Sequence, residues 1–427
     1  MIKIMKLGDV PAEQIFARVV PQMDVSKIVS EIIADVQNNK DEALYRYCQK
    51  FDGAELSALE VSKEELDEAI ASVEPEFLDI LRQACENIRE FHSRQVRNSF
   101  ILSERAGVVM GQKIIPIEKV GLYVPGGTAA YPSTVLMDAV PAKIAGCSEI
   151  VITTPPGKDG KIPAAILAAA KIAGVDRVFK VGGAQAIAAL AYGTESIPKV
   201  DKIVGPGNAF VAEAKKQVFG TVSIDMIAGP SEILIVADDT CNPVYVAADL
   251  LSQAEHDKLA SAVLVTDSPR LAEQVQAEVS RQLETLPRKE IAETSIENNG
   301  KIIVTESIQQ AIDVSNALAP EHLELCMDTP FDYLDAVKHA GSVFLGKYCP
   351  EALGDYFAGP NHTLPTSGTA RFSSPLSVDD FVKKTQYTYY TRDALQKVSG
   401  TIAKFAEKEG LHAHGRSAVV RFEEVSL

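Results

Sequence analysis

Hydrophobic residues near the start of the chain recur every three or four positions, which predicts helices. From Ser26 to about Val96, segments such as VSEIIADV and LDILRQACENI place their apolar residues along one side of a helix. Ser62 and Glu65 form a capping box ahead of one helix, and Pro75 suits the first turn of the next. The chain is therefore expected to open with a helical region.

Between Val108 and Val236, short runs of β-branched residues alternate with Ala-rich helical segments. The runs include VVMGQKIIPI, IVITT and EILIVA, and PAAILAAAKIAG is one of the helical segments. This alternation predicts a parallel, doubly wound sheet. It continues as far as the run HLELC, which predicts a second α/β layer. After about Ser373 the pattern is helical again, and such terminal arms often cross to a neighbouring subunit.

The order of these segments predicts one domain inserted into another, because the unit at 123–231 separates the helical start from the later strands. The expected fold class is α/β, with two Rossmann-like doubly wound domains and small N- and C-terminal helical segments. The expected boundaries are an N-terminal segment at 1–22, a Rossmann-like domain made of 23–122 and 232–373, an inserted NAD-binding domain at 123–231, and a C-terminal helical arm at 374–427.

Length, charge and cysteine content exclude several classes of protein. A chain of 427 residues is too long for one ordinary core, and a net charge of −16 opposes binding to nucleic acid or to anionic membranes. The start, MIKIMKLGDV, lacks the apolar region of a signal peptide. Six dispersed cysteines without a CxxC pair fit free thiols in a reducing compartment. We expect a cytoplasmic protein with neither nucleic acid nor a membrane as partner.

Three glycine-rich turns follow predicted strands, at 124–133 (VPGGTAAYPS), 181–189 (VGGAQAIAA) and 204–210 (VGPGNAF). Glycine lets the backbone approach a ligand, and the N–H groups at a helix start attract phosphate. None of the turns matches G-x-G-x-x-G, and glycine after a strand is often an ordinary turn. Three such turns in one α/β unit favour a site that binds a dinucleotide.

Six of the seven histidines lie beyond Gln253. Gln253 and His256 are spaced i, i+3 near a helix end, which makes them neighbours on one face. Asp355 and His362 flank the loop GDYFAGPNH. Nitrogen and oxygen donors of this mixture suit zinc or a similar divalent ion. Taken singly, each histidine has the alternative role of an ordinary hydrogen-bonded residue.

Glu321 and His322 stand side by side in PEHLELC, at the entry to a predicted strand. Adjacent side chains on extended backbone point apart, so we expect the two to address different atoms. His322 is suited to act as a base near neutral pH, and Glu321 to activate a water molecule. The alternative is a solvent-facing pair. Cys147 and Cys326 lack an activating neighbour in the sequence and are interpreted as packing residues.

The stretch IDMIAGPSEILIVADDTCNPVYVAADLLSQAEH, at 224–256, resembles the signature of the histidinol dehydrogenase family. GLYVPGG, GGAQAIAAL, GPGNAF, APEHLEL, ALGDYFAGPNHTLPTSGTARF and EGLHAH follow the family's order. The resemblance implies a homodimeric enzyme with shared active sites, one Zn²⁺ per subunit and NAD as cofactor. It also implies oxidation of L-histidinol to L-histidine through L-histidinal with two NAD, the last two steps of histidine biosynthesis.

The resemblance also assigns residues. Glu321 and His322 would be the catalytic pair, and the family pattern EGL-x-AH leaves His412 at the free position. Zinc would be held by Gln253, His256, Asp355 and, from the neighbouring subunit, His414. NAD would contact Tyr123, Gln185 and Asn208. Substrate would contact Ser231, Gln253, His256, His322, Asp355, His362, Glu409 and His414.

Three other functions compete with this interpretation. A related dehydrogenase could act on another small alcohol, although Glu409 and His362 argue against a changed pocket. A zinc hydrolase could use Glu321 to activate metal-bound water, whose pKa can fall to about 7. The third alternative is a non-catalytic protein that binds a metal or a nucleotide.

Overall fold

The computed structural model describes residues 1–18, 24–126 and 130–423. The chain divides into two compact units. Unit 1 consists of Met1–Gln95 and Ile117–Phe381, and unit 2 consists of Val96–Pro116 and Val382–Leu427. Each unit is described by itself.

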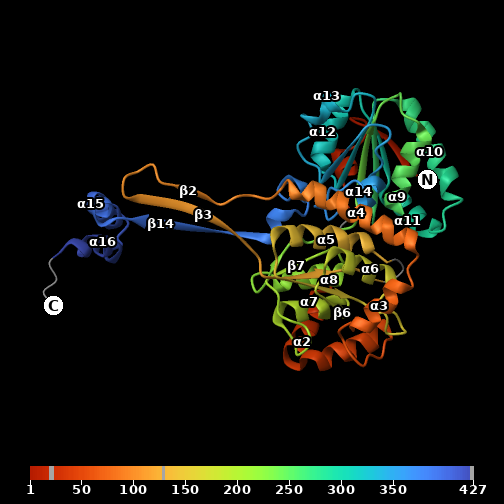
Figure 1. Cartoon of the computed structure of the whole chain (residues 1–427). Coiled ribbons are helices and arrows are strands. Elements are labelled where there is room, and N and C mark those ends of the chain that lie inside the picture. Colours follow the sequence, from red (N-terminus) through yellow and green to blue (C-terminus); the bar gives the residue numbers. More distant parts are fainter. Residues whose placement is uncertain (19–23, 127–129, 424–427) are drawn as a thin grey trace. The chain divides into compact units, whose positions relative to one another are not determined.

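A parallel six-stranded sheet forms one layer of unit 1 (Figure 1). In spatial order its strands are β1 (Lys3–Lys6), β11 (Lys301–Val304), β10 (Ser261–Thr266), β9 (Glu232–Ala237), β12 (His322–Cys326) and β13 (Ser342–Leu345). The alternating residues of β9 show how both faces are buried: Ile233 and Ile235 join one core cluster, and Leu234 and Val236 join the other. The helices that supply these clusters are α9 (Pro243–Ala254), α10 (Pro269–Leu283) and α11 (Lys289–Asn299) on one face and α12 (Ile308–Leu318) on the other.

A parallel five-stranded sheet forms the second layer of unit 1. In spatial order its strands are β6 (Arg177–Lys180), β5 (Glu149–Thr154), β4 (Lys119–Tyr123), β7 (Lys202–Val204) and β8 (Ser223–Ile224). Its covering helices are α5 (Pro132–Ala145), α6 (Ala164–Ala173), α7 (Gly183–Tyr192) and α8 (Ala209–Val218). The chain runs from β4 outward to β6 and then restarts at β7 on the other side, so the topological switch point lies between β4 and β7. The predicted α/β fold with two parallel sheets is confirmed.

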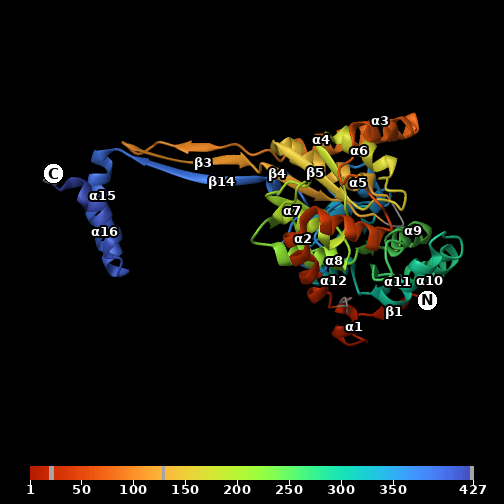
Figure 2. The ribbon, with the colours of Figure 1, turned by 90° about the horizontal axis from the view of Figure 1, so that it is seen from below.

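Three early helices, α2 (Ser26–Tyr47), α3 (Lys63–Ala71) and α4 (Pro75–Ser93), pack against helices of the five-stranded sheet. Figure 2 shows α2 beside α7 and α8. The helix starts follow the sequence signals, since Ser62 Oγ accepts a hydrogen bond from Glu65 N at 3.1 Å and Pro75 opens α4. The sequence grouped these helices with residues 232–373, whereas their packing partners belong to 123–231. The domain boundaries themselves stay a prediction.

Unit 2 contains an antiparallel sheet in the order β14 (Val382–Tyr390), β3 (Val108–Pro116) and β2 (Phe100–Leu102). Two helices follow, α15 (Arg392–Lys408) and α16 (His412–Val419). Two expectations from the sequence are wrong here: 108–116 is a strand outside the parallel sheet, and the supposedly helical region after Ser373 contains β14. The segment VKKTQYTYY carries few of the purely apolar residues that mark a buried strand, so its pairing with β3 left little trace in the pattern.

The short elements complete the described chain. They are α1 (Ala12–Phe16), α13 (Phe331–Leu334), α14 (Glu351–Tyr356), the π-helical turn Cys48–Asp52, and the 3₁₀ turns Thr369–Arg371, Val378–Phe381 and Val420–Phe422. Within the described ranges, no helix combines the length and the apolar character needed to cross a bilayer.

Candidate active site

Glu321 and His322 lie at the amino end of β12 and are both buried, with 7% and 3% of their surfaces exposed. His322 Nδ1 lies 3.7 Å from Glu321 Oε2. The expectation that the two side chains point apart is therefore wrong. The alternation rule applies within a strand, but Glu321 precedes the strand and follows Ala319, whose φ of +46° turns the chain just before it.

The first residue of the neighbouring strand, Glu232, holds both members of this pair through its backbone. Glu232 N donates to Glu321 Oε2 at 2.8 Å, and His322 Nδ1 lies 3.0 Å from Glu232 O. Because a carbonyl oxygen can only accept, Nδ1 carries a proton and donates it. In the neutral ring this leaves the lone pair on Nε2, which has no hydrogen-bond partner among the described residues.

Helix α14 brings two carboxylates to that free nitrogen. His322 Nε2 lies 3.7 Å from Asp355 Oδ1 and 3.9 Å from Glu351 Oε1. Glu351 and Asp355 are four residues apart and so share one helix face. One ligand atom from each of the three residues lies within 4.8 Å of the others, an arrangement that could hold a metal ion. The sequence pattern pointed to Asp355 and not to Glu351, although the i, i+4 spacing of the two acids was a usable signal.

Two further predicted site histidines lie beside Asp355. His362 Nδ1 lies 3.1 Å from Asp355 O and 3.8 Å from Asp355 Oδ1, while its Nε2 lies 3.3 Å from Thr134 Oγ1. The charges of Asp355 and His322 act on the imidazole of His256, so His256 lies within electrostatic range of both. The structure thus gathers residues from four separate parts of the sequence.

Gln253 lies near the end of α9, three residues before His256, and is fully buried. Neither Nε2 nor Oε1 of its amide has a hydrogen-bond partner in the part of the chain that the structure describes. Leaving a buried polar atom without a partner costs about 1–3 kcal/mol. A bound ion or a polar ligand at Gln253 would remove that cost.

Burial and charge set the protonation of Glu321 and His322. Burial raises the pKa of Glu321 to about 8, and the charge of His322 offsets part of that rise. Burial acts to lower the pKa of His322, but the carboxylates of Glu321, Asp355 and Glu351 outweigh it and raise this pKa to about 10. Because the two side chains are 3.7 Å apart, they titrate as one coupled pair.

The pKa values of the surrounding groups shift in opposite directions. Burial opposes ionisation of Asp355, but the imidazoles of His322 and His362 outweigh it and lower the pKa of Asp355. Burial and the charge of Asp355 raise the pKa of Glu351 to about 7. Burial lowers the pKa of His256 and His362, which favours the neutral imidazole that binds metals.

The predicted NAD residues lie on the five-stranded sheet. Tyr123 ends β4, and its hydroxyl accepts a hydrogen bond from Gly183 N at 3.0 Å. Gln185 is buried in α7. Asn208 caps α8, because its Oδ1 accepts from the backbone N–H groups of the next turn.

The turns that carry these residues follow β4, β6 and β7 at the carboxyl ends of the strands, where α/β sheets bind nucleotides. Positions 127–129 of the first turn lie outside the described residues. The NAD contacts themselves stay a prediction.

The remaining predicted site residues are in two places. Ser231 directly precedes Glu232, and its carbonyl accepts from Ser261 N at 2.9 Å. Glu409 and His414 belong to unit 2 and are exposed there, as is His412. Their proposed role at a neighbouring subunit's site stays a prediction.

The thiols fit the packing role that the sequence assigned to them. Cys147 and Cys326 are buried. Burial raises the pKa of Cys147 to about 11, and a hydrogen bond with Cys241 together with burial raises that of Cys326. Neither thiol is activated as a nucleophile.

A family model described as histidinol dehydrogenase matches residues 18–422. The chain belongs to the histidinol dehydrogenase family. The histidinol dehydrogenase of Clostridium acetobutylicum is 56% identical to it over 428 residues, and the match covers 99% of each chain. That of Bacillus cereus is 58% identical over 400 residues, covering 94% of this chain and 93% of the relative.

A solved structure supports the same assignment. The crystal structure of histidinol dehydrogenase from Elizabethkingia anophelis has a TM-score of 0.93 to this chain at 42% identity, covering 98% of both chains. Membership of the histidinol dehydrogenase family confirms the resemblance found in the sequence. It also confirms the predicted enzyme class, an oxidoreductase.

Proposed function

We propose that this chain oxidises L-histidinol to L-histidine through L-histidinal, reducing two NAD, in the last two steps of histidine biosynthesis. The observation that carries the proposal is the cluster at His322, where a buried imidazole with a free Nε2 faces two carboxylates in a chain of the histidinol dehydrogenase family. The proposed setting is a cytoplasmic homodimer.

The metal in this proposal is zinc, held by Gln253, His256 and Asp355 and by His414 of the neighbouring subunit. The donor set fits a borderline divalent ion. The Gln253 amide, which has no partner among the described residues, is the feature that a ligand would satisfy. When bound, zinc supplies Lewis-acid positions for the amine and imidazole nitrogens of the substrate. Ser231, His362 and Glu409 are the proposed additional contacts to substrate.

In the first oxidation, His322 takes the proton of the substrate hydroxyl on Nε2. With a cation held at Asp355, the carboxylates would raise the pKa of His322 less, and the Nδ1–H bond to Glu232 O fixes the neutral tautomer whose Nε2 is the base. Loss of the hydroxyl proton and transfer of a hydride from the same carbon convert the alcohol to the aldehyde. NAD, in contact with Tyr123, Gln185 and Asn208, supplies the hydride acceptor.

In the second oxidation, Glu321 takes a proton from water as the oxygen of that water adds to the aldehyde carbon. A buried carboxyl with a raised pKa is a stronger base once ionised than one in water. As the water adds, protonated His322 returns its proton to the aldehyde oxygen, so the hydrate again has a C–H beside an O–H. His322 then takes the hydroxyl proton as the hydride leaves to a second NAD, which yields the carboxylic acid. One site can therefore serve both steps.

The test is an assay of purified protein with zinc, NAD and L-histidinol. We expect two NADH for each histidine formed. NADH formation from other small alcohols but not from histidinol would instead indicate a related dehydrogenase. Hydrolysis without NADH would indicate a zinc hydrolase, and complete inertness a non-catalytic binding protein.

A further inference from the structure

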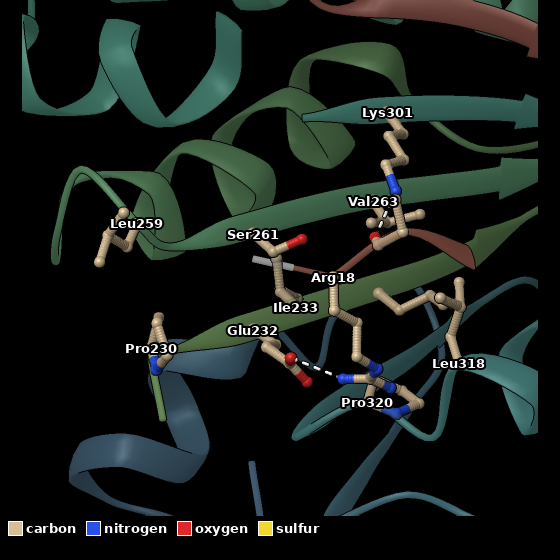
Figure 3. Close-up of a pocket in the computed structure, with 12 residues that line it drawn as sticks. Arg18, Pro230, Glu232, Ile233, Leu259, Ser261, Val263, Lys301, Leu318 and Pro320 are labelled. Carbon is tan, nitrogen blue, oxygen red and sulfur yellow. Dashed lines mark hydrogen bonds and ion pairs between the residues drawn. The ribbon is translucent and has the colours of Figure 1, made fainter. Parts of the chain in front are cut away.

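The N-terminal segment of unit 1 is tied to the amino ends of the six-stranded sheet. Lys301 opens β11, and its Nζ donates to the carbonyl oxygens of Ile15 at 3.1 Å and Ala17 at 2.7 Å. These carbonyls lie at the end of α1, where the helix leaves acceptors unpaired. Lys301 therefore holds the end of α1 beside the sheet. Arg18, the residue after Ala17, is held there with it (Figure 3).

Arg18 crosses the amino ends of the strands to reach Glu232. Figure 3 shows its guanidinium directed at the Glu232 carboxylate, and Arg18 Nη1 lies 2.7 Å from Glu232 Oε1. The two side chains are 27% and 15% exposed. A pair this far removed from water holds its geometry better than a surface pair, and loss of one partner leaves a partly buried charge uncompensated.

Glu232 connects this ion pair to the catalytic pair through further contacts of its own. Its backbone N–H donates to Glu321 Oε2, and its carbonyl accepts from His322 Nδ1. Burial raises the pKa of the Glu232 carboxylate, and the charge of Arg18 together with the nearby backbone N–H groups of Ser367 and Glu321 offsets part of that rise. Glu232 thus contacts Arg18 through its side chain, and it contacts Glu321 and His322 through its backbone.

We infer that Arg18 and Glu232 are positioning residues that hold Glu321 and His322 in their catalytic orientation. Neither side chain has a place among the substrate, zinc or NAD contacts of the proposed function, on which this inference rests. Their effect should fall on the chemical steps and leave binding intact, because small displacements of a positioned catalytic group can cost up to about a hundredfold in rate.

The experiment compares Arg18→Ala with Arg177→Ala in the zinc-loaded enzyme. Arg177 is the matched control, since it makes an ion pair with Glu60 at 2.7 Å and is 33% exposed, away from the cluster at His322. We expect Arg18→Ala to lower kcat for histidinol about 10- to 100-fold while KM for histidinol and zinc content stay near the parent values. Arg177→Ala should keep the parent kcat.

Chemical rescue separates positioning from general stability. A cavity of about 30 Å³ lies beside Arg18, lined by Glu232, Ser261 and Lys301 among others, and truncation of Arg18 would enlarge it. Guanidinium at non-denaturing concentration should then bind Glu232 and restore part of kcat. Urea and methylammonium should not, and Arg18→Lys should keep more kcat than Arg18→Ala. A merely destabilised protein would gain nothing from guanidinium.

The outcomes distinguish this inference from the proposed function. A parent enzyme that forms no NADH from histidinol would refute the proposed function. An active parent whose Arg18→Ala variant keeps its kcat, or loses it through KM alone, would refute the positioning role and leave the function standing. If Arg18→Ala does not fold, Glu232→Gln replaces it with the same expected loss of kcat at constant KM, and an unchanged kcat again overturns the inference.

Discussion

Glu351 Oε1 lies 3.9 Å from His322 Nε2, and neither atom has a hydrogen-bond partner among the residues that the structure describes. Both side chains are almost fully buried. The Gln253 amide adds two more unpartnered buried atoms. At about 1–3 kcal/mol for each unsatisfied group, the protein alone leaves this cluster in an unfavourable state. Groups arranged in this way are suited to receive a polar ligand or a cation.

Zinc is therefore expected to stabilise the folded chain. Protein stripped with a chelator should melt at a lower temperature than protein supplied with zinc, because a ligand at a hundred times its Kd adds about 2.7 kcal/mol. Gln253→Ala should lose most of this zinc-dependent shift, since it removes a proposed ligand. Gln37→Ala, an exposed position on α2, should keep the shift in full. An equal shift in parent and Gln253→Ala would remove Gln253 from the metal site.

Glu321→Gln is expected to separate the two oxidations. Glutamine keeps the size of the side chain and an acceptor for Glu232 N, but it cannot take a proton from water. The yield should fall from two NADH per histidinol consumed towards one, with the aldehyde accumulating and captured by semicarbazide. Glu306→Gln, at an exposed position, is the control and should still give two. Equal loss in both oxidations would contradict the role assigned to Glu321.

The sequence predicted the layers of the fold because strands buried on both faces leave continuous apolar runs. EILIVA and HLELC became β9 and β12 in the parallel sheet. The pattern could not place β14 or β3, since a three-stranded antiparallel sheet has fewer buried positions and its register depends on the partner strand. The packing of α2–α4 likewise depends on tertiary contacts between segments far apart in the sequence.

Most residues of the candidate site were predicted from the sequence, but their geometry was not. Asp355 lies within 4 Å of both His322 and His362, and its charge acts on His256, whereas the metal and catalytic roles stay predictions. Glu351 was missed because its i, i+4 spacing from Asp355 indicates that the two acids share a helix face, but not that this face meets the start of β12. Glu232 was missed for a similar reason. It contacts Glu321 and His322 through its backbone atoms and Arg18 through its side chain, and neither kind of contact is visible in the sequence.

Gly205→Ala is expected to damage the proposed NAD site. Gly205 has φ +114° at the end of β7, and a Cβ there would collide with the backbone oxygen of Tyr123. The Tyr123 and Asn208 regions would have to move apart, so we expect KM for NAD to rise about tenfold to a hundredfold. The kinetic measurement is the dependence of NADH formation on NAD concentration.

Gly220→Ala is the matched control for that change. Gly220 has a similar φ of +100°, but a Cβ there meets nothing within 4 Å. Both variants therefore carry the same kind of backbone strain, and only Gly205→Ala carries the collision. A similar rise in KM for NAD in both variants would show that strain, and not the approach to Tyr123, is responsible.

Mixed dimers test whether the active site is shared between subunits. His256→Ala and His414→Ala should each be inactive alone, because each removes a proposed zinc ligand. After subunit exchange, a heterodimer should contain one intact site and recover part of the parent activity. Exchange is followed with differently tagged subunits. If subunit exchange is demonstrated but no activity returns, His414 belongs to the site of its own chain.

Asp138 is expected to make stability depend on pH. It is fully buried in α5, where Thr363 Oγ1 donates to its Oδ1 at 2.9 Å, and burial raises its pKa to about 8. An unfolded aspartate titrates near pH 4, so between about pH 4 and 8 the folded chain binds one more proton than the unfolded chain at this group. This contribution to stability is complete below that window and is lost as the pH rises through 8.

Asp138→Asn should remove that pH dependence, since asparagine keeps the acceptor for Thr363 and has no proton to lose. Between pH 6 and 9 the parent should lose roughly 3 kcal/mol of unfolding free energy relative to Asp138→Asn. Urea unfolding at each pH measures the difference, and Asp335→Asn, at an exposed position, controls for a change of net charge. Parallel pH curves for the parent and Asp138→Asn would mean that Asp138 is ionised in the folded chain at neutral pH.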